Sequence, residues 1–532
     1  MDVQSRPTSA RHRLRRVRDE LHAAYVLRQA GFLRLDPPRR LAAIARAGRR
    51  YGPMGSATIA AALRHPNRVA ILDEDGPVTY AELDRRSNAV ANAWQARGVR
   101  AGTTVAMLVR NHRGFYDAFF ATQKLGARTV LLNTDFAGPQ LREVATREGT
   151  EMLAYDPEFE PLVGELGLPL GAVTDWTDHA GHDEGSPPPA PGQHGSIVIL
   201  TSGTTGTPKG ANRGATTSLT PMAALLGAVR FPAGGTTVIA APLFHSLGLV
   251  TGAVAVGLGS TQILRRRFDP GAVLDALAEH HAEAIVLVPI MLKRLIDEQE
   301  RAPRDVSTLR IALVAGSQLG APLAQRATSV LGDVVHNLYG STEVAFATIA
   351  RPEHLRVDPS TVGPATLGTR LRIVDDAGRP VPAGTTGRIV VGNAIPFEGY
   401  TGGGGKPIVG GLLSSGDVGH LDARGLLYID GRDDAMIVSG GENVFPDEIE
   451  SLLAGHPEIA DAAAIGVDDD TYGQRLSVFV VLRDNATLDE DGVRDYVRQN
   501  LARFKVPRDV VFLDHLPRNP TGKVLKRELA PT

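Results

Sequence analysis

Apolar segments of two kinds alternate along the chain after residue 65. The segment 79–99 (TYAELDRRSNAVANAWQARGV) places apolar residues at helical spacing behind a threonine that can cap a helix. Short apolar runs such as TVAMLV, TVLLN and IVIL, and later AIVLVP and RIALVAG, have the length and composition of buried strands. Because helical and strand-like segments alternate, the pattern predicts an α/β fold built on mostly parallel sheets.

Two changes in composition divide the chain. Residues 179–195 read as a Pro- and Gly-rich linker, and a second break comes near GRDD at 431–434, after which the chain carries strands of its own (AAAIGV and LSVFVVL). We therefore expect a basic helical N-terminal extension (1–54), a large multi-subdomain α/β domain (55–430) and a small α+β C-terminal domain (431–532).

The first fifty residues predict two helices. The first runs from Ser9 to Ala30 and ends at Gly31, and the second is shorter, basic and follows Pro38. The apolar positions of the first helix recur at helical spacing: Leu14, Val17, Leu21 and Ala24.

Charge is concentrated in this N-terminal segment. Residues 1–50 hold thirteen arginines and four acids, a net charge of +9, which leaves -11 for the rest of the chain. Such an amphipathic segment can lie on an anionic membrane surface. The alternative, which we favour, is an extension packed on the main body with its arginines in solvent.

Overall composition excludes several classes of protein. Hydrophobic residues at 43% and charged residues at 22% are ordinary globular values, and a net charge of -2 argues against a dedicated nucleic-acid binder. The chain has no cysteine, which excludes disulfides, thiolate nucleophiles and thiolate zinc sites. No apolar run approaches the ~20 residues that span a bilayer. We expect a cytoplasmic protein, with any membrane contact peripheral and at the inner face.

The strongest local signal is ILTSGTTGTPKG at residues 199–210. A strand-like run leads into glycines that let backbone N–H groups surround phosphate oxygens, while threonine and serine hydroxyls and Lys209 add further donors. The segment is not a Walker A loop, because Pro208 stands where the second glycine, counted from Gly203, belongs. The pattern predicts a phosphate-binding loop of another kind.

This loop and five later blocks resemble the adenylate-forming, acyl-activating superfamily of AMP-dependent synthetases and ligases. The similarity covers about residues 55–532, the blocks stand in the family's order, and their pattern looks most like that of bacterial fatty-acid–CoA ligases. A glycine-rich GYTGG (399–403) departs from the usual pattern. The five blocks are APLFHSLG (241–248), LYGSTE (338–343), LLSSGDVGHLD (412–422), GRDDAMIVSGGENVFPDEIE (431–450) and RNPTGKVLKREL (518–529).

The resemblance implies ATP-dependent activation of a carboxylic acid. A carboxylate is a poor acyl donor because its leaving group would be oxide, so the family makes an acyl-AMP intermediate and then acyl-CoA, releasing pyrophosphate and AMP. The implied substrates are ATP, coenzyme A and an acid, for which a medium- or long-chain fatty acid is expected, and the implied metal is Mg²⁺. Catalysis of this kind is mainly positioning and neutralisation of spread negative charge.

The resemblance also assigns nucleotide contacts. The loop at 201–209 would hold the β- and γ-phosphates, Tyr339 would lie along the adenine, and Asp417 would accept two ribose hydroxyls, with Arg432 adding a ribose or phosphate contact. The assigned ATP and AMP contacts are Thr201, Ser202, Gly203, Thr204, Thr205, Gly206, Lys209, Gly316, Ser317, Gln318, Tyr339, Gly340, Ser341, Asp417 and Arg432.

Four residues carry implied catalytic roles. Lys523, in PTGK, would bridge the substrate carboxylate and the α-phosphate, and Thr342 would bond the α-phosphate. Glu343, with the hydroxyl of Thr201 or Thr204, would hold Mg²⁺, a cation that takes oxygen ligands.

The fourth is His245 in LFHSLG. Amino-acid-activating members place an aspartate there for the substrate ammonium group, so a histidine argues against an amino acid substrate. A histidine suits the gating of an uncharged acyl or aryl chain, and the alternative is a histidine that only packs within its loop.

The family's small domain swings between two reactions. Asp434 matches the hinge position, where a few residues absorb a large backbone rotation. The flexible segment of Ser439, Gly440, Gly441 and Glu442 would then form the channel for coenzyme A.

Two other functions stay open. One is a fatty acyl-AMP ligase that loads a separate carrier protein; we expect no fused carrier, since nine residues follow Lys523. The other is a catalytically silent scaffold, which would be expected to lack Glu343, Asp417 or Lys523, and all three are present.

Overall fold

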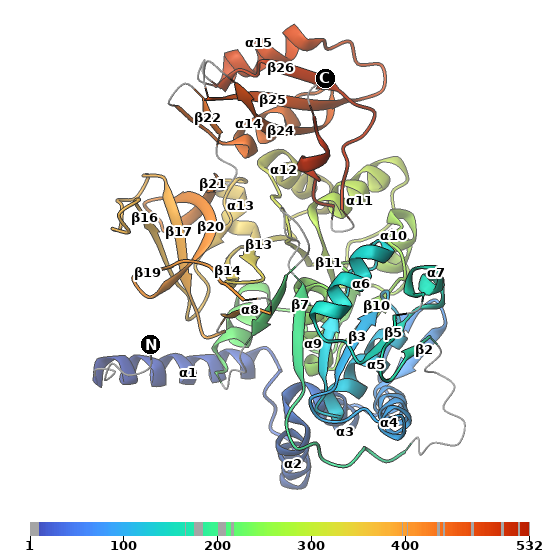
Figure 1. Ribbon diagram of the computed structural model, residues 1–532. Helices are drawn as coiled ribbons and strands as arrows, with labels where there is room; N and C mark the ends of the chain where they lie inside the picture. Colours follow the sequence, from blue (N-terminus) through green and yellow to red (C-terminus); the bar gives the residue numbers. More distant parts are fainter. Residues whose placement is uncertain are drawn as a thin grey trace.

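The computed structural model of the chain has a body and a smaller C-terminal domain, drawn in red tones in Figure 1. Its described residues are 10–164, 166–174, 185–200, 209–213, 218–395, 397–401, 403–433, 437–439, 442–469, 473–501, 505–519 and 522–530. Three sheets build the body and one builds the C-terminal domain, within these residues. The expected large α/β domain with a small second domain is thus confirmed, while the boundaries at residues 54 and 430 stay predictions.

The largest sheet is parallel except at its two edges. The edge strands β2 and β14 run antiparallel to their neighbours. In spatial order its strands are β14 (Ala345–Ala350), β13 (Val335–Ser341), β12 (Ile311–Val314), β11 (Ala284–Leu287), β9 (Thr236–Ile239), β10 (Thr261–Leu264), β1 (Val69–Asp73) and β2 (Gly76–Thr79).

The second sheet has a parallel part and an antiparallel edge. Strands β8 and β18 form that edge, next to the end of the predicted phosphate loop. Its order is β18 (Phe397–Tyr400), β8 (Gly210–Arg213), β7 (Ser196–Leu200), β4 (Arg128–Leu131), β3 (Thr104–Leu108), β5 (Met152–Tyr155) and β6 (Ala172–Val173). Five of the predicted buried runs are strands β3, β4, β7, β11 and β12 of these two sheets.

The other two sheets are mostly antiparallel. The third contains β15 (Gly363–Pro364), β21 (Leu426–Arg432), β20 (Leu412–Leu421), β17 (Gly387–Gly392), β16 (Arg370–Val374) and, paired with β20, β19 (Ile408–Val409). The C-terminal domain contains β23 (Glu442–Val444), β22 (Ile437–Ser439), β25 (Gly473–Leu482), β24 (Ile459–Asp469) and, parallel to β25, β26 (Asp509–Phe512).

Helices cover the two large sheets of the body and one face of the C-terminal sheet (Figure 1). The helix predicted at 79–99 is α4, and Thr79 caps it in a capping box with Glu82. The helices are α1 (Ala10–Gln29), α2 (Pro38–Gly55), α3 (Ala57–Arg64), α4 (Tyr80–Ala96), α5 (Arg113–Lys124), α6 (Gly138–Arg147), α7 (Glu160–Val163), α8 (Thr220–Val229), α9 (Ser246–Leu258), α10 (Pro270–Glu279), α11 (Pro289–Arg301), α12 (Ala321–Leu331), α13 (Pro352–Val357), α14 (Pro446–Ala454) and α15 (Glu490–Asn500).

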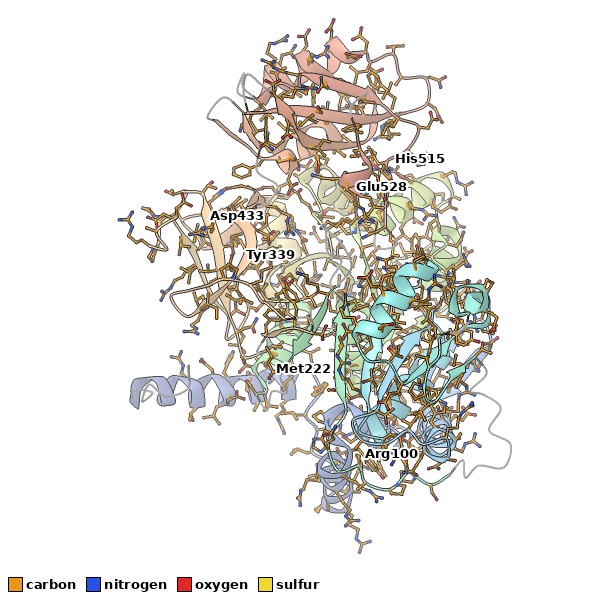
Figure 2. The ribbon with its side chains drawn as sticks, in the orientation of Figure 1. Arg100, Met222, Tyr339, Asp433, His515 and Glu528 are labelled. Atoms are coloured by element: carbon orange, nitrogen blue, oxygen red, sulfur yellow. The ribbon has the colours of Figure 1, made fainter. Side chains whose placement is uncertain are left out.

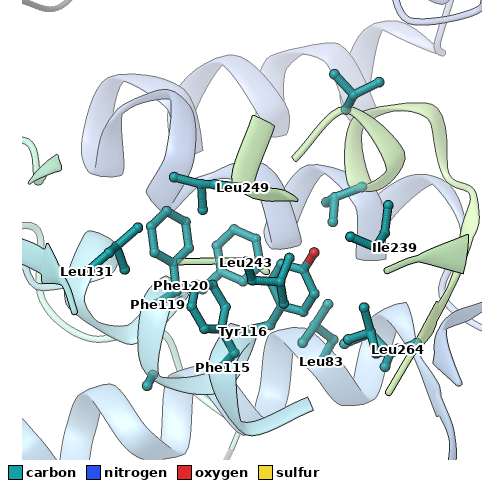
Figure 3. Packing of buried hydrophobic residues seen from close by; sticks show 14 of the residues in the cluster. Leu83, Phe115, Tyr116, Phe119, Phe120, Leu131, Ile239, Leu243, Leu249 and Leu264 are labelled. Atoms are coloured by element: carbon teal, nitrogen blue, oxygen red, sulfur yellow. The ribbon is translucent and has the colours of Figure 1, made fainter. Parts of the chain in front are cut away.

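One apolar core joins the two large sheets. Helix α5 brings four aromatic rings into it, and Figure 3 shows these rings packed against leucines from α4, β4 and the start of α9. Phe115 and Phe119 stack with ring centroids 6.1 Å apart, as do Tyr116 and Phe120 at 5.7 Å. Rings in such arrangements add roughly 0.5–1.5 kcal/mol per pair beyond their area burial, so α5 holds the two sheets in a fixed relation.

The N-terminal extension packs through residues other than those that indicated its first helix. Helix α1 buries Ala23 and Leu27 against the body, whereas Val17 and Leu21 are exposed. Its N-terminal half extends away from the body at the lower left of Figure 1. Among the described helices, none has both the length and the apolar content required to cross a bilayer.

Candidate active site

The site residues gather at one edge of the largest sheet. Strand β9 precedes His245, β12 precedes residues 316–318, and β13 ends in residues 339–341 with Thr342 and Glu343 directly after it. These strands are parallel and neighbours in the order β13, β12, β11, β9. Because the carboxyl ends of parallel strands meet at one edge, residues far apart in sequence meet there, which is where ligands bind in open α/β sheets.

A hydrogen bond links this edge to the third sheet. The Tyr339 hydroxyl donates to Asp417 Oδ2 at 2.6 Å, and Asp417 on β20 lies opposite Arg432 on β21. Figure 2 shows Tyr339 in the part of the body below the C-terminal domain. Burial raises the pKa of Asp417, against the opposing effects of the Tyr339 hydroxyl, Arg432 and Lys406. Asp417, expected to bind the ribose, is therefore half-buried beside the cations Arg432 and Lys406. It is hydrogen-bonded to Tyr339, which is expected to lie along the adenine.

Glu343 links the same edge to the second sheet. Its Oε2 accepts from Ser341 Oγ at 2.8 Å and its Oε1 accepts from the Tyr400 hydroxyl at 2.6 Å. Burial and the neighbouring carboxylate raise the pKa of Tyr400, so the phenol stays protonated and donates. Lys209, the last residue of the predicted phosphate loop, places its Nζ 5.3 Å from the centroid of the Tyr400 ring. The structure thus brings Lys209, Ser341 and Glu343 together around Tyr400.

The donor chemistry here fits Mg²⁺. Glu343 presents a carboxylate that is hydrogen-bonded only to neutral hydroxyls in the contacts above, so its charge stays available. No group of three or more His, Cys, Asp or Glu side chains able to hold a metal occurs among the described residues. Mg²⁺ commonly takes one or two carboxylates and completes its shell with water and substrate phosphates. The expected second ligand, Thr201, lies outside the described residues.

The predicted adenine loop contacts the C-terminal domain. Residues 316–318 are exposed directly after β12, and Gln318 Nε2 donates to Ser451 Oγ on α14 at 3.3 Å. Gly316 has φ +102°, a backbone conformation that favours glycine. The loop therefore lies between the sheet edge and the smaller domain.

Lys523 lies in a tight loop that packs against the same sheet edge. Lys523 N donates to Asn519 Oδ1 at 2.9 Å, and Gly522 N donates to Asn519 O at 2.8 Å. Gly522 has φ +77°, and a Cβ there would lie 2.0 Å from Cγ2 of Ile290, the second residue of α11. Since α11 follows β11, Gly522 packs just beyond the carboxyl end of this central strand, whose neighbour β12 precedes residues 316–318.

His245 occupies the N-cap position of α9. Its side chain makes no capping hydrogen bond, its ring lies 4.5 Å from the Phe244 ring between centroids, and its Nε2 is buried with no hydrogen-bond partner. Removal from water lowers the pKa of His245 to about 4. At neutral pH this position therefore presents an uncharged imidazole in apolar surroundings.

Sequence reasoning missed Asn111, which holds the His245 segment in place. Asn111 is buried in the turn after β3, where Nδ2 donates to Ala241 O at 2.9 Å and Ile239 O at 3.3 Å, and Oδ1 accepts from Leu243 N at 2.8 Å. A polar residue three positions after a buried strand was the available signal. Its partners are backbone groups of another sheet, and these could not be identified from the sequence.

We expect Asn111→Ala to reduce kcat/KM for the acid about tenfold and to leave KM for ATP unchanged. The substitution leaves buried backbone groups of the His245 segment unpaired, each at a cost of about 1–3 kcal/mol. Steady-state kinetics with each substrate varied would measure this. Asn92→Ala removes an exposed contact to Ser186 O and is the matched control. An unchanged KM for the acid with a uniformly lower kcat would show that Asn111 only supports the fold.

Some predicted positions fall outside the described residues. These are Thr201, Ser202, Gly203, Thr204, Thr205, Gly206, Asp434, Gly440 and Gly441. For Ser439 and Glu442 the backbone is described, and the two residues pair across the β22–β23 hairpin. Tyr400 belongs to GYTGG, the segment that departs from the usual family pattern. Sequence reasoning gave Tyr400 no role, and in the structure its hydroxyl donates to Glu343.

Comparisons with known proteins identify the family. The model of the AMP-binding enzyme family matches residues 59–401, and that of the AMP-binding enzyme C-terminal domain matches residues 448–523. Feruloyl-CoA synthase of an Amycolatopsis species is 33% identical over 492 residues, 90% of this chain and 98% of that protein. Fatty acid–[acyl-carrier-protein] ligase ScoC of Streptomyces coeruleorubidus is 30% identical, over 88% of this chain and 94% of its own length.

A solved structure gives the same result. The o-succinylbenzoate CoA synthetase MenE of Bacillus subtilis, in complex with its acyl-adenylate intermediate, matches with a TM-score of 0.80 and 29% identity, over 90% of this chain and 98% of MenE. The sequence blocks, the two family matches and this similarity over nearly the whole length agree. The chain belongs to the AMP-binding enzyme family, the adenylate-forming synthetases and ligases that its sequence blocks resemble.

Proposed function

We propose that this protein is an AMP-forming acid–CoA ligase whose acid is a medium- or long-chain fatty acid. It uses ATP, Mg²⁺ and coenzyme A. The observation that carries the choice of an apolar acid is the uncharged His245, half-buried beside Phe244 with a buried and unpartnered Nε2. These two side chains offer no charge to an ammonium group or a second carboxylate group of the acid. They therefore favour an apolar chain.

In the first reaction, a carboxylate oxygen of the acid attacks the α-phosphorus of ATP. A P–O bond forms, the bond to pyrophosphate breaks, and pyrophosphate leaves with the electron pair. Two anions approach each other, so neutralisation of charge is the main task. Mg²⁺ supplies charge neutralisation at the phosphates, and Glu343 is the carboxylate that would hold it. Asp417 and Tyr339 hold the nucleoside end.

Lys523 supplies the cation at the reacting centre. Its loop packs on Ile290 at the sheet edge, next to the strand that precedes residues 316–318. From there the ammonium group reaches between the acid carboxylate and the α-phosphate. Lysine suits this role, because it is a compact charge with three donors on a flexible stem.

The second reaction requires the smaller domain to rotate. The thiol sulfur of coenzyme A attacks the acyl carbon of acyl-AMP, AMP leaves, and the thiol proton is released. Asp433 N donates to Gly416 O of the body at 3.0 Å, whereas Ile437 pairs with Val444 in the C-terminal sheet. Asp434 therefore stands between a residue held by the body and a strand of the smaller domain, as a hinge requires. The rotation brings the segment from Ser439 to Glu442 to the acceptor channel.

A substrate panel tests the choice of acid. Pyrophosphate release and acyl-CoA formation would be measured with saturated acids from C2 to C20 and with ferulate, indoleacetate and 2-succinylbenzoate. We expect kcat/KM to be highest for medium- or long-chain fatty acids and at least tenfold lower for the aromatic acids, because each buried CH₂ adds about 0.8 kcal/mol. A maximum with ferulate would contradict the fatty-acid assignment and leave the ligase chemistry intact.

The same assay tests the acceptor. The similarity to ScoC, named as a fatty acid–[acyl-carrier-protein] ligase, favours a carrier protein as the second candidate acceptor. Acyl-CoA formation at a rate equal to pyrophosphate release would exclude that candidate. Pyrophosphate release without acyl-CoA would support it, and no release with any acid would indicate a silent scaffold.

We expect His245→Ala to change the preference among acyl chains, or the KM for the acid, at least fivefold while KM for ATP stays near wild type. Removing the ring leaves more apolar space beside Phe244. It changes none of the residues assigned to ATP. Because the pKa of His245 is about 4, the wild-type kcat/KM should show no inflection from this residue between about pH 5 and pH 8. Chain-length profiles and pH profiles measure both effects.

His336→Ala is the matched control, since His336 is a buried histidine on β13 with Nδ1 bonded to Val334 O at 3.0 Å. It should affect stability and leave chain preference unchanged. Loss of ATP binding in His245→Ala would instead place His245 in the nucleotide site or in the fold.

A further inference from the structure

Helix α1 has one apolar stripe that packs on the body and a second that does not. Ala23 and Leu27 are fully buried. Val17, Leu21 and Tyr25 are 57%, 67% and 59% exposed. At about 100° per residue, positions four apart differ by about 40°, so these three side chains form a continuous stripe. The helix is therefore amphipathic on a face that the folded chain leaves open.

Exposed large apolar side chains are concentrated in this region. Eleven such side chains occur among the described residues, and six of them lie between residues 17 and 41. Isolated exposed apolar residues are ordinary, whereas a continuous stripe such as the one on α1 marks an interaction surface. The six are Val17, Leu21, Tyr25, Leu33, Leu35 and Leu41.

The body holds the helix so that this stripe is presented. Glu20 accepts a hydrogen bond from Leu219 N at 3.0 Å and another from Ser218 Oγ, just before α8. Leu27 and Ala23 pack in the same core as α8. The C-terminal half of α1 is thus fixed, and its N-terminal half extends beyond the body (Figure 1).

The charge on α1 selects the partner. The helix carries six arginines and two acids, and Arg18 next to the stripe is 78% exposed. On the same helical geometry Arg28 lies at the stripe itself. A second copy of this chain would bring arginine against arginine, whereas an anionic surface offers both opposite charge and an apolar layer.

We propose that the face of α1 formed by Val17, Leu21 and Tyr25, with Arg18 and Arg28, docks on an anionic lipid surface. The apolar side chains enter the boundary between headgroups and acyl chains, where the amphipathic Tyr25 ring is suited to lie. The arginines contact lipid phosphates. This docking does not depend on which acid the enzyme activates.

Vesicle binding by the full chain tests the proposal. Binding to vesicles of phosphatidylglycerol and phosphatidylcholine would be compared with binding to phosphatidylcholine alone, at low and physiological salt. The triple variant V17S/L21S/Y25S should bind the anionic vesicles about tenfold more weakly, since it removes the apolar contact. The variant R18E/R28E, which keeps the stripe, should lose binding to a similar extent and remove much of the salt dependence.

Matched controls lie on exposed sites elsewhere. V357S/I408S replaces two apolar residues that are 60% and 71% exposed, and R379E reverses an arginine that is 77% exposed. Neither should change binding. The proposal is overturned if the full chain does not bind anionic vesicles at low salt, or if the controls lose binding equally. It is also overturned if sedimentation shows that V17S/L21S/Y25S abolishes a dimer without changing vesicle binding, since a second copy is then the partner.

Discussion

Replacing Lys523 with alanine should slow formation of the acyl-adenylate about 10²–10³-fold, equivalent to ~3–4 kcal/mol of barrier. The loop that carries Lys523 packs on Ile290 at the carboxyl edge of the largest sheet, where the acid carboxylate and the α-phosphate are proposed to meet. Loss of one preorganised cation at that point leaves the developing negative charge without its partner. Pyrophosphate release under single-turnover conditions measures this step directly.

The second half-reaction provides the internal control. Transfer from chemically prepared acyl-AMP to coenzyme A should stay within a few-fold of wild type, because the proposed rotation of the smaller domain would take Lys523 out of the site. Lys293→Ala removes a lysine on α11 that pairs with Asp297 at 3.6 Å and should change neither rate. Equal losses in both half-reactions would show that Lys523 supports the loop or the domain as a whole.

Local features of the chain explain what the sequence predicted correctly. Helix α4 carries its own start signal in the Thr79–Glu82 capping box, and strands β3, β4 and β7 are buried runs short enough to exclude helices. Tyr339 and Asp417 lie within strands β13 and β20, and Lys523 lies after a turn, each inside a short block of contiguous residues. Such patterns depend on neighbours in sequence and need no knowledge of distant contacts.

Features that depend on distant partners were predicted wrongly or not at all. The packing face of α1 is set by α8, two hundred residues later, so small residues such as Ala23 are buried while Leu21 is exposed. Asn111 acts through backbone groups at residues 239–243, and Tyr400 acts through Glu343. In each case the partner, and not the residue's own pattern, determines the role.

The interaction between Tyr400 and Glu343 leads to the second large expected effect. Glu343→Gln should reduce kcat/KM for MgATP about 10²–10³-fold and raise the Mg²⁺ concentration needed for half-maximal rate. The amide keeps the shape of the side chain but removes the charge proposed to bind Mg²⁺, and its NH₂ group cannot accept from the Tyr400 or Ser341 hydroxyl. Rates measured across a Mg²⁺ titration at fixed ATP would show the shift.

Tyr400→Phe separates the charge of Glu343 from its orientation. This variant removes the 2.6 Å hydrogen bond to Oε1 but leaves the carboxylate charged, with Ser341 still bonded to Oε2. A lost hydrogen bond to a charged group is worth about 1.5–3 kcal/mol, so the rate should fall about tenfold to a hundredfold, less than in Glu343→Gln. If Tyr400→Phe reproduced the full loss and the full Mg²⁺ shift, Glu343 would be acting through the tyrosine, and its assignment as the metal carboxylate would be wrong. We expect a smaller loss with little Mg²⁺ dependence, because the phenol orients the carboxylate through one hydrogen bond, whereas the proposed metal contact depends on the charge of the carboxylate.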